Sequence, residues 1–377
     1  MKAARKIWRT AWRLGVCALL LFWIFHTIFL NEGRIAWERQ GHSWLELSRR
    51  QQWQAAWSHG PRELWHTLMW VNPMALTLSL GFMGLTILAG VVRWRMVLRI
   101  HGLDLSLPRA TEISFVAHFF NSFLLGATGG DLLKAYYAAR ETHHKKMEAV
   151  VTVVVDRLLG LFAMLLFACL MMLPNLSLLG THRRLAALAV LILVMTAGCG
   201  LVISLSFWGG LSRLWPRSRP ALRKLPGGEL FEQCVDACRA FGRHPGFILR
   251  AMAVSMVLNV VCVLQFWAVA RGLGLNISPR ALLVIVPMII CVSALPITPS
   301  GLGVRENLYV LMLAVPEINV TATQALSLSL LAYAGSLFWS LVGGVVYAGL
   351  KERHHLVEVA QPDAAGANCR GKLRPAK

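Results

Sequence analysis

Six stretches of the chain are apolar for long enough to cross a membrane as a helix. A spanning helix needs roughly 20 consecutive residues that are predominantly apolar. Stretches of about this length occupy residues 14–30, 74–92, 150–173, 185–208, 248–270 and 325–350. The pattern therefore predicts an all-α polytopic membrane protein with about six spanning helices.

Two further apolar stretches are shorter and interrupted. The first covers residues 113–128 and stops at a Gly-Gly-Asp sequence, and the second covers residues 281–295 and resumes over 304–315. Glycine allows the chain to turn sharply, and proline cannot continue a helix. We therefore expect two helical hairpins, at about 113–147 and 281–318. The residues expected to break them are Gly129, Gly130, Pro296, Pro299, Gly301 and Gly303.

The distribution of basic residues indicates how these hairpins are placed. Cytoplasmic loops of membrane proteins carry an excess of Lys and Arg. If each hairpin returns to the side from which it entered, most of the 38 Lys and Arg residues face one side, whereas single crossings divide them almost equally. Re-entrant hairpins and closely paired full crossings give the same sidedness, so both remain open. Either version predicts cytoplasmic termini and two hairpins that enter from opposite faces, as in an inverted repeat.

Composition supports the membrane class and limits the functions to consider. The chain is 56% hydrophobic and 15% charged, with a mean hydropathy of +0.56, whereas soluble domains carry about 25% charged residues. The net charge of +20 is spread between apolar runs, so we expect no nucleic-acid partner. We expect one transmembrane domain over residues 1–350 and a disordered cytoplasmic tail over 351–377. The expected location is the cytoplasmic (inner) membrane of a bacterium.

The loops contain little that could carry chemistry. There is no Gly-rich ATP-binding sequence, and the cysteine spacing supplies no set of zinc ligands. No loop is long enough for a soluble catalytic domain. We therefore expect a protein that is not an enzyme and that binds neither a metal nor another cofactor.

The first hairpin contains polar residues that could contact a substrate. Asp131 opens the helix after the Gly-Gly pair, where a carboxylate caps free N–H groups; it could instead contact an ion or a headgroup. Lys134 follows one turn later and could pair with Asp131 or hold a lipid phosphate. Asn121 belongs to the same group. Asp156 and Arg157, within the next span, could line a cavity beside this hairpin or reach the membrane edge.

The second hairpin places Arg305 and Glu306 at membrane depth. Charged residues there are costly and mark functional sites by default. Arg305 is the leading candidate to bind a phosphate through paired hydrogen bonds; the alternative is a structural ion pair with Asp131 or Asp156. Glu306 suits stabilisation of the helix start better than contact with a ligand. Together with Asn121, Asp131, Lys134, Asp156 and Arg157, these are the candidate substrate-binding residues.

These sequences resemble a known family. The motifs are Gly129-Gly130-Asp131 with Lys134, then Asp156-Arg157 with Gly160, then Leu295-Pro296 with Gly301, Gly303 and Arg305-Glu306. They are similar to the flippase-like membrane family, the transmembrane region of lysylphosphatidylglycerol synthases. The resemblance implies a bundle with re-entrant helices that moves lipids or lipid-linked molecules between leaflets. The soluble synthase domain of some members does not follow residue 350, so we expect no synthase activity.

Three functions remain in consideration. We expect a lipid flippase or transporter that moves a phospholipid or a lipid-linked headgroup, with membrane lipids, in particular anionic ones, as partners. A second copy of the chain or a lipid-synthesis enzyme is a further expected partner. One rival is a non-transporting accessory subunit of a lipid or glycolipid synthesis pathway. The other is a membrane-embedded transferase, which would need paired carboxylates that the scattered acidic residues do not supply.

Overall fold

The computed structural model is almost entirely helical and confirms an all-α polytopic membrane protein. It describes residues 22, 26, 29–30, 33–34, 37, 43–123, 129–142, 145–207, 238–295, 301, 303–349 and 357–358. Its elements are η1 (Trp44–Glu46), α2 (Arg49–Met69), α3 (Pro73–Ile100), β1 (Leu103–Asp104), α4 (Leu107–Phe123), α5 (Gly129–Glu141), α6 (Lys146–Met172), η2 (Leu173–Asn175), α7 (Leu176–Thr181), α8 (Arg183–Phe207), α12 (Pro245–Gly272), α13 (Pro279–Ser293), α14 (Val304–Leu313), α15 (Ala322–Gly349) and β2 (Val357–Glu358).

Within the described residues, five helices are long and apolar enough to cross a membrane. They are Pro73–Ile100, Lys146–Asn175, Leu185–Phe207, Pro245–Gly272 and Ala322–Gly349. These match the predicted spans at 74–92, 150–173, 185–208, 248–270 and 325–350. The sixth predicted span, 14–30, lies mostly outside the described residues.

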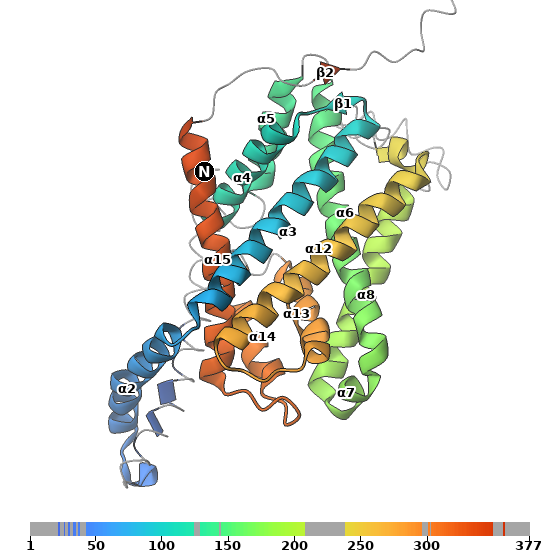
Figure 1. Ribbon diagram of the computed structural model, residues 1–377. Helices are drawn as coiled ribbons and strands as arrows, with labels where there is room; N and C mark the ends of the chain where they lie inside the picture. The colour runs from blue at the N-terminus through green and yellow to red at the C-terminus, as the bar shows by residue number, and fades with distance from the viewer. Residues whose placement is uncertain are drawn as a thin grey trace, which may run out of the picture.

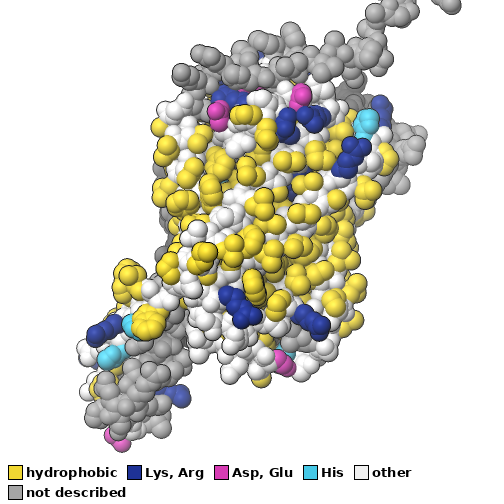
Figure 2. Space-filling model, in the orientation of Figure 1, with side chains coloured by type: hydrophobic (Ala, Val, Ile, Leu, Met, Phe, Trp, Pro, Cys, Tyr) yellow, Lys and Arg dark blue, Asp and Glu magenta, His cyan; other side chains and the backbone are white. Residues whose placement is uncertain are grey.

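The surface of the bundle is apolar around its middle. Figure 2 shows hydrophobic side chains across the central part of the visible face, with most of the charged side chains towards its two ends. Leu193, Leu201 and Val345 are examples of large apolar side chains that are more than half exposed. A soluble protein rarely exposes so continuous an apolar surface. The distribution is that of a bundle whose middle faces lipid.

Each region predicted to form a hairpin contains two helices that pack against each other, α4 with α5 and α13 with α14. Figure 1 places α4 and α5 in the half of the bundle where α3 ends, and α13 and α14 in the half where α3 begins. The two helix pairs therefore lie in opposite halves of the bundle. Entry into the membrane and the inverted-repeat relation remain predictions.

The first turn depends on a close approach of two helices. The sequence pattern extends the first apolar arm to residue 128, but α4 ends at Phe123 and residues 124–128 lie outside the described part of the chain. The α5 helix begins at Gly129, and the N–H of Gly130 donates to Asn121 Oδ1 over 2.9 Å. A Cβ atom on Gly130 would collide with the carbonyl oxygen of Ala117. Only glycine therefore fits where the two helices meet.

The second turn uses glycine for its backbone conformation. Gly301 and Gly303 have φ angles of 69° and 82°, a region that residues with a side chain rarely adopt. Gly303 is the N-cap of α14. The predicted breaks at Pro296 and Pro299 lie outside the described residues.

The C-terminal segment contributes one small element. Val357 and Glu358 of β2 pair antiparallel with Asp104 and Leu103 of β1. The remainder of the predicted disordered tail, 351–356 and 359–377, lies outside the described residues.

Candidate functional site

The first charged centre lies where α3, α5 and α6 meet. Asp156 on α6 accepts a hydrogen bond from Arg93 Nε at 2.8 Å, and its other oxygen lies 3.6 Å from Lys134 Nζ. All three side chains are nearly buried. We call Arg93, Lys134 and Asp156 the Asp156 triad. It comprises two cations and one carboxylate, so it has a formal charge of +1.

Neighbouring residues hold the cations of the triad in place. The Lys134 ammonium lies 4.2 Å from the centre of the Trp94 ring, close enough for a cation–π interaction. Arg93 Nη1 donates to Ser255 Oγ on α12 over 3.1 Å. The guanidinium also occupies the space beside Gly160, where a Cβ atom would lie only 2.8 Å from it. Four helices therefore converge on this charged centre.

A second ion pair lies beside the triad. Arg157, the residue after Asp156, pairs with Asp131 in the first turn of α5. The Arg157 side chain is 43% exposed, far more than any member of the triad. Asp131 therefore neutralises Arg157 and also occupies the position where a carboxylate stabilises a helix start.

The second charged centre lies at the start of α14. Glu306 is completely buried; it accepts a hydrogen bond from the N–H of Gly303 at 2.6 Å and pairs with Arg305. Ser329 Oγ on α15 accepts from Arg305 Nε at 3.2 Å and donates to Glu306 Oε1 at 3.3 Å. The Arg305 guanidinium carbon lies 4.5 Å from the centre of the Tyr333 ring. This centre is formally neutral.

The structure brings together most of the candidate residues on the first hairpin but gives some of them other partners than the sequence suggested. Lys134 pairs with Asp156 and not with Asp131. Arg305 pairs with its neighbour Glu306 and not with Asp131 or Asp156, each of which has a different basic partner. Asn121 acts on the backbone, since its side chain holds the N–H of Gly130. Glu306 has the helix-start role expected of it.

Arg93 is the functional candidate that sequence reasoning missed. It directly follows the apolar stretch 74–92, a position typical of a side chain that anchors a helix at the membrane edge. However, α3 continues to Ile100, so Arg93 lies inside the helix and faces Asp156. The one feature of the sequence that could have indicated Arg93 was Asp156, because a carboxylate within an apolar span needs a buried basic partner.

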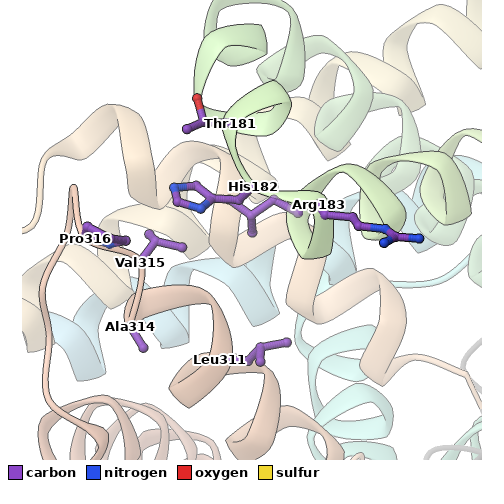
Figure 3. Close-up of a pocket in the computed structure, with 8 residues that line it drawn as sticks. Thr181, His182, Arg183, Leu311, Ala314, Val315 and Pro316 are labelled. Carbon is purple, nitrogen blue, oxygen red and sulfur yellow. The ribbon is translucent and has the colours of Figure 1, made fainter.

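A cleft of about 350 Å³ opens at the end of the bundle that holds the second hairpin. It is lined by Thr181, His182, Arg183, Leu185, Leu311, Ala314, Val315 and Pro316. Figure 3 shows the His182 ring directed towards Val315 and Pro316, whereas the Arg183 side chain extends away from them. His182 Nε2 lies 2.7 Å from Glu317 Oε2, so this pair joins the α7–α8 turn to the segment after α14. No residue of either charged centre lines the cleft.

The described residues offer no evident metal site. Within them, no group of three or more His, Cys, Asp and Glu side chains is placed to hold a metal ion.

Comparison with known proteins identifies similar sequences. The family model described as the lysylphosphatidylglycerol synthase TM region matches residues 52–343. A UPF0104 membrane protein of Pyrococcus horikoshii is 26% identical over 295 residues, which cover 72% of this chain and 85% of that protein. Another, from Methanothermobacter thermautotrophicus, is 26% identical over 306 residues, covering 73% of this chain and 84% of its own length.

Proposed function

Because the chain belongs to the family of the lysylphosphatidylglycerol synthase transmembrane region, we propose that it moves a phospholipid or a lipid-linked headgroup between the leaflets of a membrane. The substrate class that suits it best is an anionic lipid with a phosphate group. We also propose that it lies in the cytoplasmic membrane of a bacterium; if both hairpins return to the side from which they enter, most basic residues face the cytoplasm, as the positive-inside rule describes.

The observation that carries this proposal is the formal charge of the Asp156 triad. A buried charge in a membrane is costly unless a counter-charge accompanies it. Arg93 and Lys134 share the single carboxylate of Asp156, so the triad can accept one further negative charge. A phosphodiester carries one negative charge at neutral pH. A phospholipid headgroup would therefore complete the charge balance of this centre.

The two hairpins supply groups with different roles in this proposal. Arg157 is the most exposed cation at the first centre, so it is suited to meet an incoming phosphate first. Lys134 lies deeper and has three N–H donors on its ammonium group. Asp156 pairs with this group but does not use all three donors. Arg305 belongs to the neutral second centre and would hold the headgroup only after Glu306 releases part of its hydrogen bonding.

The same geometry argues against the transferase alternative. Asp131, Asp156 and Glu306 each form an ion pair with Arg or Lys. A general base, or a carboxylate pair for a metal, would need a free carboxylate next to the substrate. Without an ATP-binding sequence, movement of the lipid would run down its gradient or be driven by an ion gradient.

Leaflet exchange in proteoliposomes tests the proposal. Fluorescent phosphatidylglycerol and phosphatidylcholine are incorporated, and the outer leaflet is bleached with dithionite at intervals. We expect the native protein to exchange phosphatidylglycerol at least tenfold faster than protein-free vesicles do. Lys134→Met should lower that rate at least tenfold, because it leaves Arg93 and Asp156 as a neutral pair.

Lys146→Met is the matched control, since Lys146 is exposed at the start of α6 and belongs to neither charged centre. It should exchange lipid at the native rate. Absence of exchange for every anionic, aminoacylated and glycosylated lipid offered to the native protein would exclude the transport function.

A further inference from the structure

One face of α15 is polar along much of its length. Ser329, Tyr333, Ser336 and Ser340 follow one another at intervals of four, three and four residues. This spacing places all four on the same side of a helix. We call these four residues the polar face of α15. Figure 1 shows α15 running past both helix pairs, and the helix packs extensively against α4 and α14.

The first half of the polar face contacts the second hairpin. Ser329 exchanges hydrogen bonds with Arg305 and Glu306, and the Tyr333 ring lies against the Arg305 guanidinium. This half of the face therefore completes the neutral charged centre at the start of α14.

The second half of the polar face contacts the end of α4 in the first hairpin. His118 Nε2 lies 3.2 Å from the carbonyl oxygen of Ser336 and 3.4 Å from its hydroxyl. Ser340 Oγ donates to the carbonyl oxygen of His118 over 3.1 Å and also contacts the hydroxyl of Ser122. The polar face thus joins α4 of the first hairpin to the start of α14 in the second.

In this interface the polar contacts lie beside close packing, since Gly343 meets the backbone of Phe115 and the Phe115 ring contacts the Trp339 ring. Polar side chains between membrane helices contribute only about 0.6 kcal/mol each on average. Ionisable side chains that face the interior of a bundle, as His118 does here, commonly mark the path of a substrate. If α4 moved away from α15, the hydroxyls of Ser336 and Ser340 and the ring of His118 could bond water or a headgroup instead. Such replacement hydrogen bonds would offset part of the cost of opening the interface.

We propose that the polar face of α15 is a binding surface for a phosphate-bearing lipid headgroup, which becomes accessible when α4 separates from α15. From Ser329 to Ser340 the helix rises about 16 Å, roughly half of the hydrocarbon thickness. The hydroxyls and the imidazole donate hydrogen bonds without a fixed charge, so they would not trap an anion between the cationic groups on the two hairpins. The choice of ligand rests on the proposed transport of anionic lipids.

Chemical accessibility of a cysteine at this surface tests the proposal. Ser340→Cys is compared with Ser327→Cys; both serines are fully buried in this structure, but Ser327 is off the polar face. The α15 helix has no native cysteine, so modification by a neutral, water-soluble thiosulfonate can be read by mass spectrometry of its peptide. We expect Ser340→Cys to react at least tenfold faster, although Ser327 lies closer to the end of α15. Equal rates would refute the opening of the interface. Ser336→Cys repeats the test if the first variant does not fold.

Lipid dependence tests the ligand separately from transport. We expect vesicles of phosphatidylglycerol to slow the reaction of Ser340→Cys at least threefold relative to vesicles of phosphatidylcholine, with no such change for Ser327→Cys. The same rate in both lipids would refute headgroup binding, even if the native protein exchanges lipid. Protection by phosphatidylglycerol without leaflet exchange would support the binding surface and refute the proposed transport.

Discussion

Replacement of Asp156 by Asn should strongly destabilise the protein, because it removes the counter-charge of two buried cations. Arg93 and Lys134 both pair with Asp156, which is only 9% exposed. Breaking a buried ion pair from one side typically costs about 3–5 kcal/mol. With a shift of roughly 2–4 °C per kcal/mol for a chain of a few hundred residues, the midpoint of thermal unfolding should fall by about 10 °C in detergent.

A matched control and a compensating variant make this expectation specific. Asp104 also has two arginine partners, Arg95 at 3.6 Å and Arg99 at 3.1 Å, but it is 49% exposed. Exposed ion pairs contribute about 0–1 kcal/mol, so Asp104→Asn should shift the midpoint by no more than about 4 °C. Adding Lys134→Met to Asp156→Asn should recover part of the loss, because only one buried cation then lacks a carboxylate.

The thermal midpoints can be followed by static light scattering or by thiol exposure during heating. If Asp156→Asn and Asp104→Asn lower the midpoint equally, or if Lys134→Met does not compensate, the account of the Asp156 triad is wrong.

Three further predictions concern the turns, the cleft and the topology. Gly130→Ala should reduce the yield of folded protein, because the added Cβ atom meets the carbonyl oxygen of Ala117. Gly198→Ala in α8 is the control, since a Cβ atom there has open space around it and the variant should fold normally. Gel filtration compares the two yields, and equal yields would contradict the packing argument. Hydrogen bonds from a backbone N–H and from His182 lower the pKa of Glu317 from its ordinary value of 4.5. Their stabilisation is therefore fully present above pH 4.5 and is lost as the pH falls through the lower folded-state value. The difference in thermal midpoint between the native protein and Glu317→Gln should thus disappear in acid, and a constant difference would refute the pairing. A membrane-impermeant maleimide should label Cys234, in the basic segment before α12, only from the cytoplasmic side, and labelling from outside would refute the re-entrant topology.

Much of the helical architecture follows from local sequence, whereas the ion pairs do not. The five observed spans could be predicted because each needs only a run of apolar residues. The tips of the hairpins could be predicted because Gly130 and Gly303 meet requirements that few other residues satisfy. Glu306 could be assigned to the helix start for the same local reason. Arg93 could not be predicted as a partner of Asp156. The pairing depends on how far α3 extends beyond its apolar stretch and on which helix packs beside α3.

The pairing of Arg305 with Glu306 shows a second limit of sequence reasoning. Neighbouring helical residues point about 100° apart, which argues against a direct contact. However, Glu306 turns back to the N–H of Gly303 at the helix start, and the long side chain of Arg305 reaches it there. The helix periodicity predicts which side chains can touch when these extend outward from the helix. It does not predict the contact of a side chain that caps its own helix.

The two charged centres differ in exposure, which has a consequence for the proposed transport. Arg157 at the first centre is 43% exposed, whereas Arg305 at the second is 14% exposed and its partner Glu306 is fully buried. A carrier that shelters a headgroup between two sites needs at least two conformations, each with a different site accessible. In this structure the cation beside the first hairpin is therefore the more accessible of the two. If the proposed transport holds, we expect a second state in which Arg305 separates from Glu306, with the polar face of α15 as the surface between the two sites.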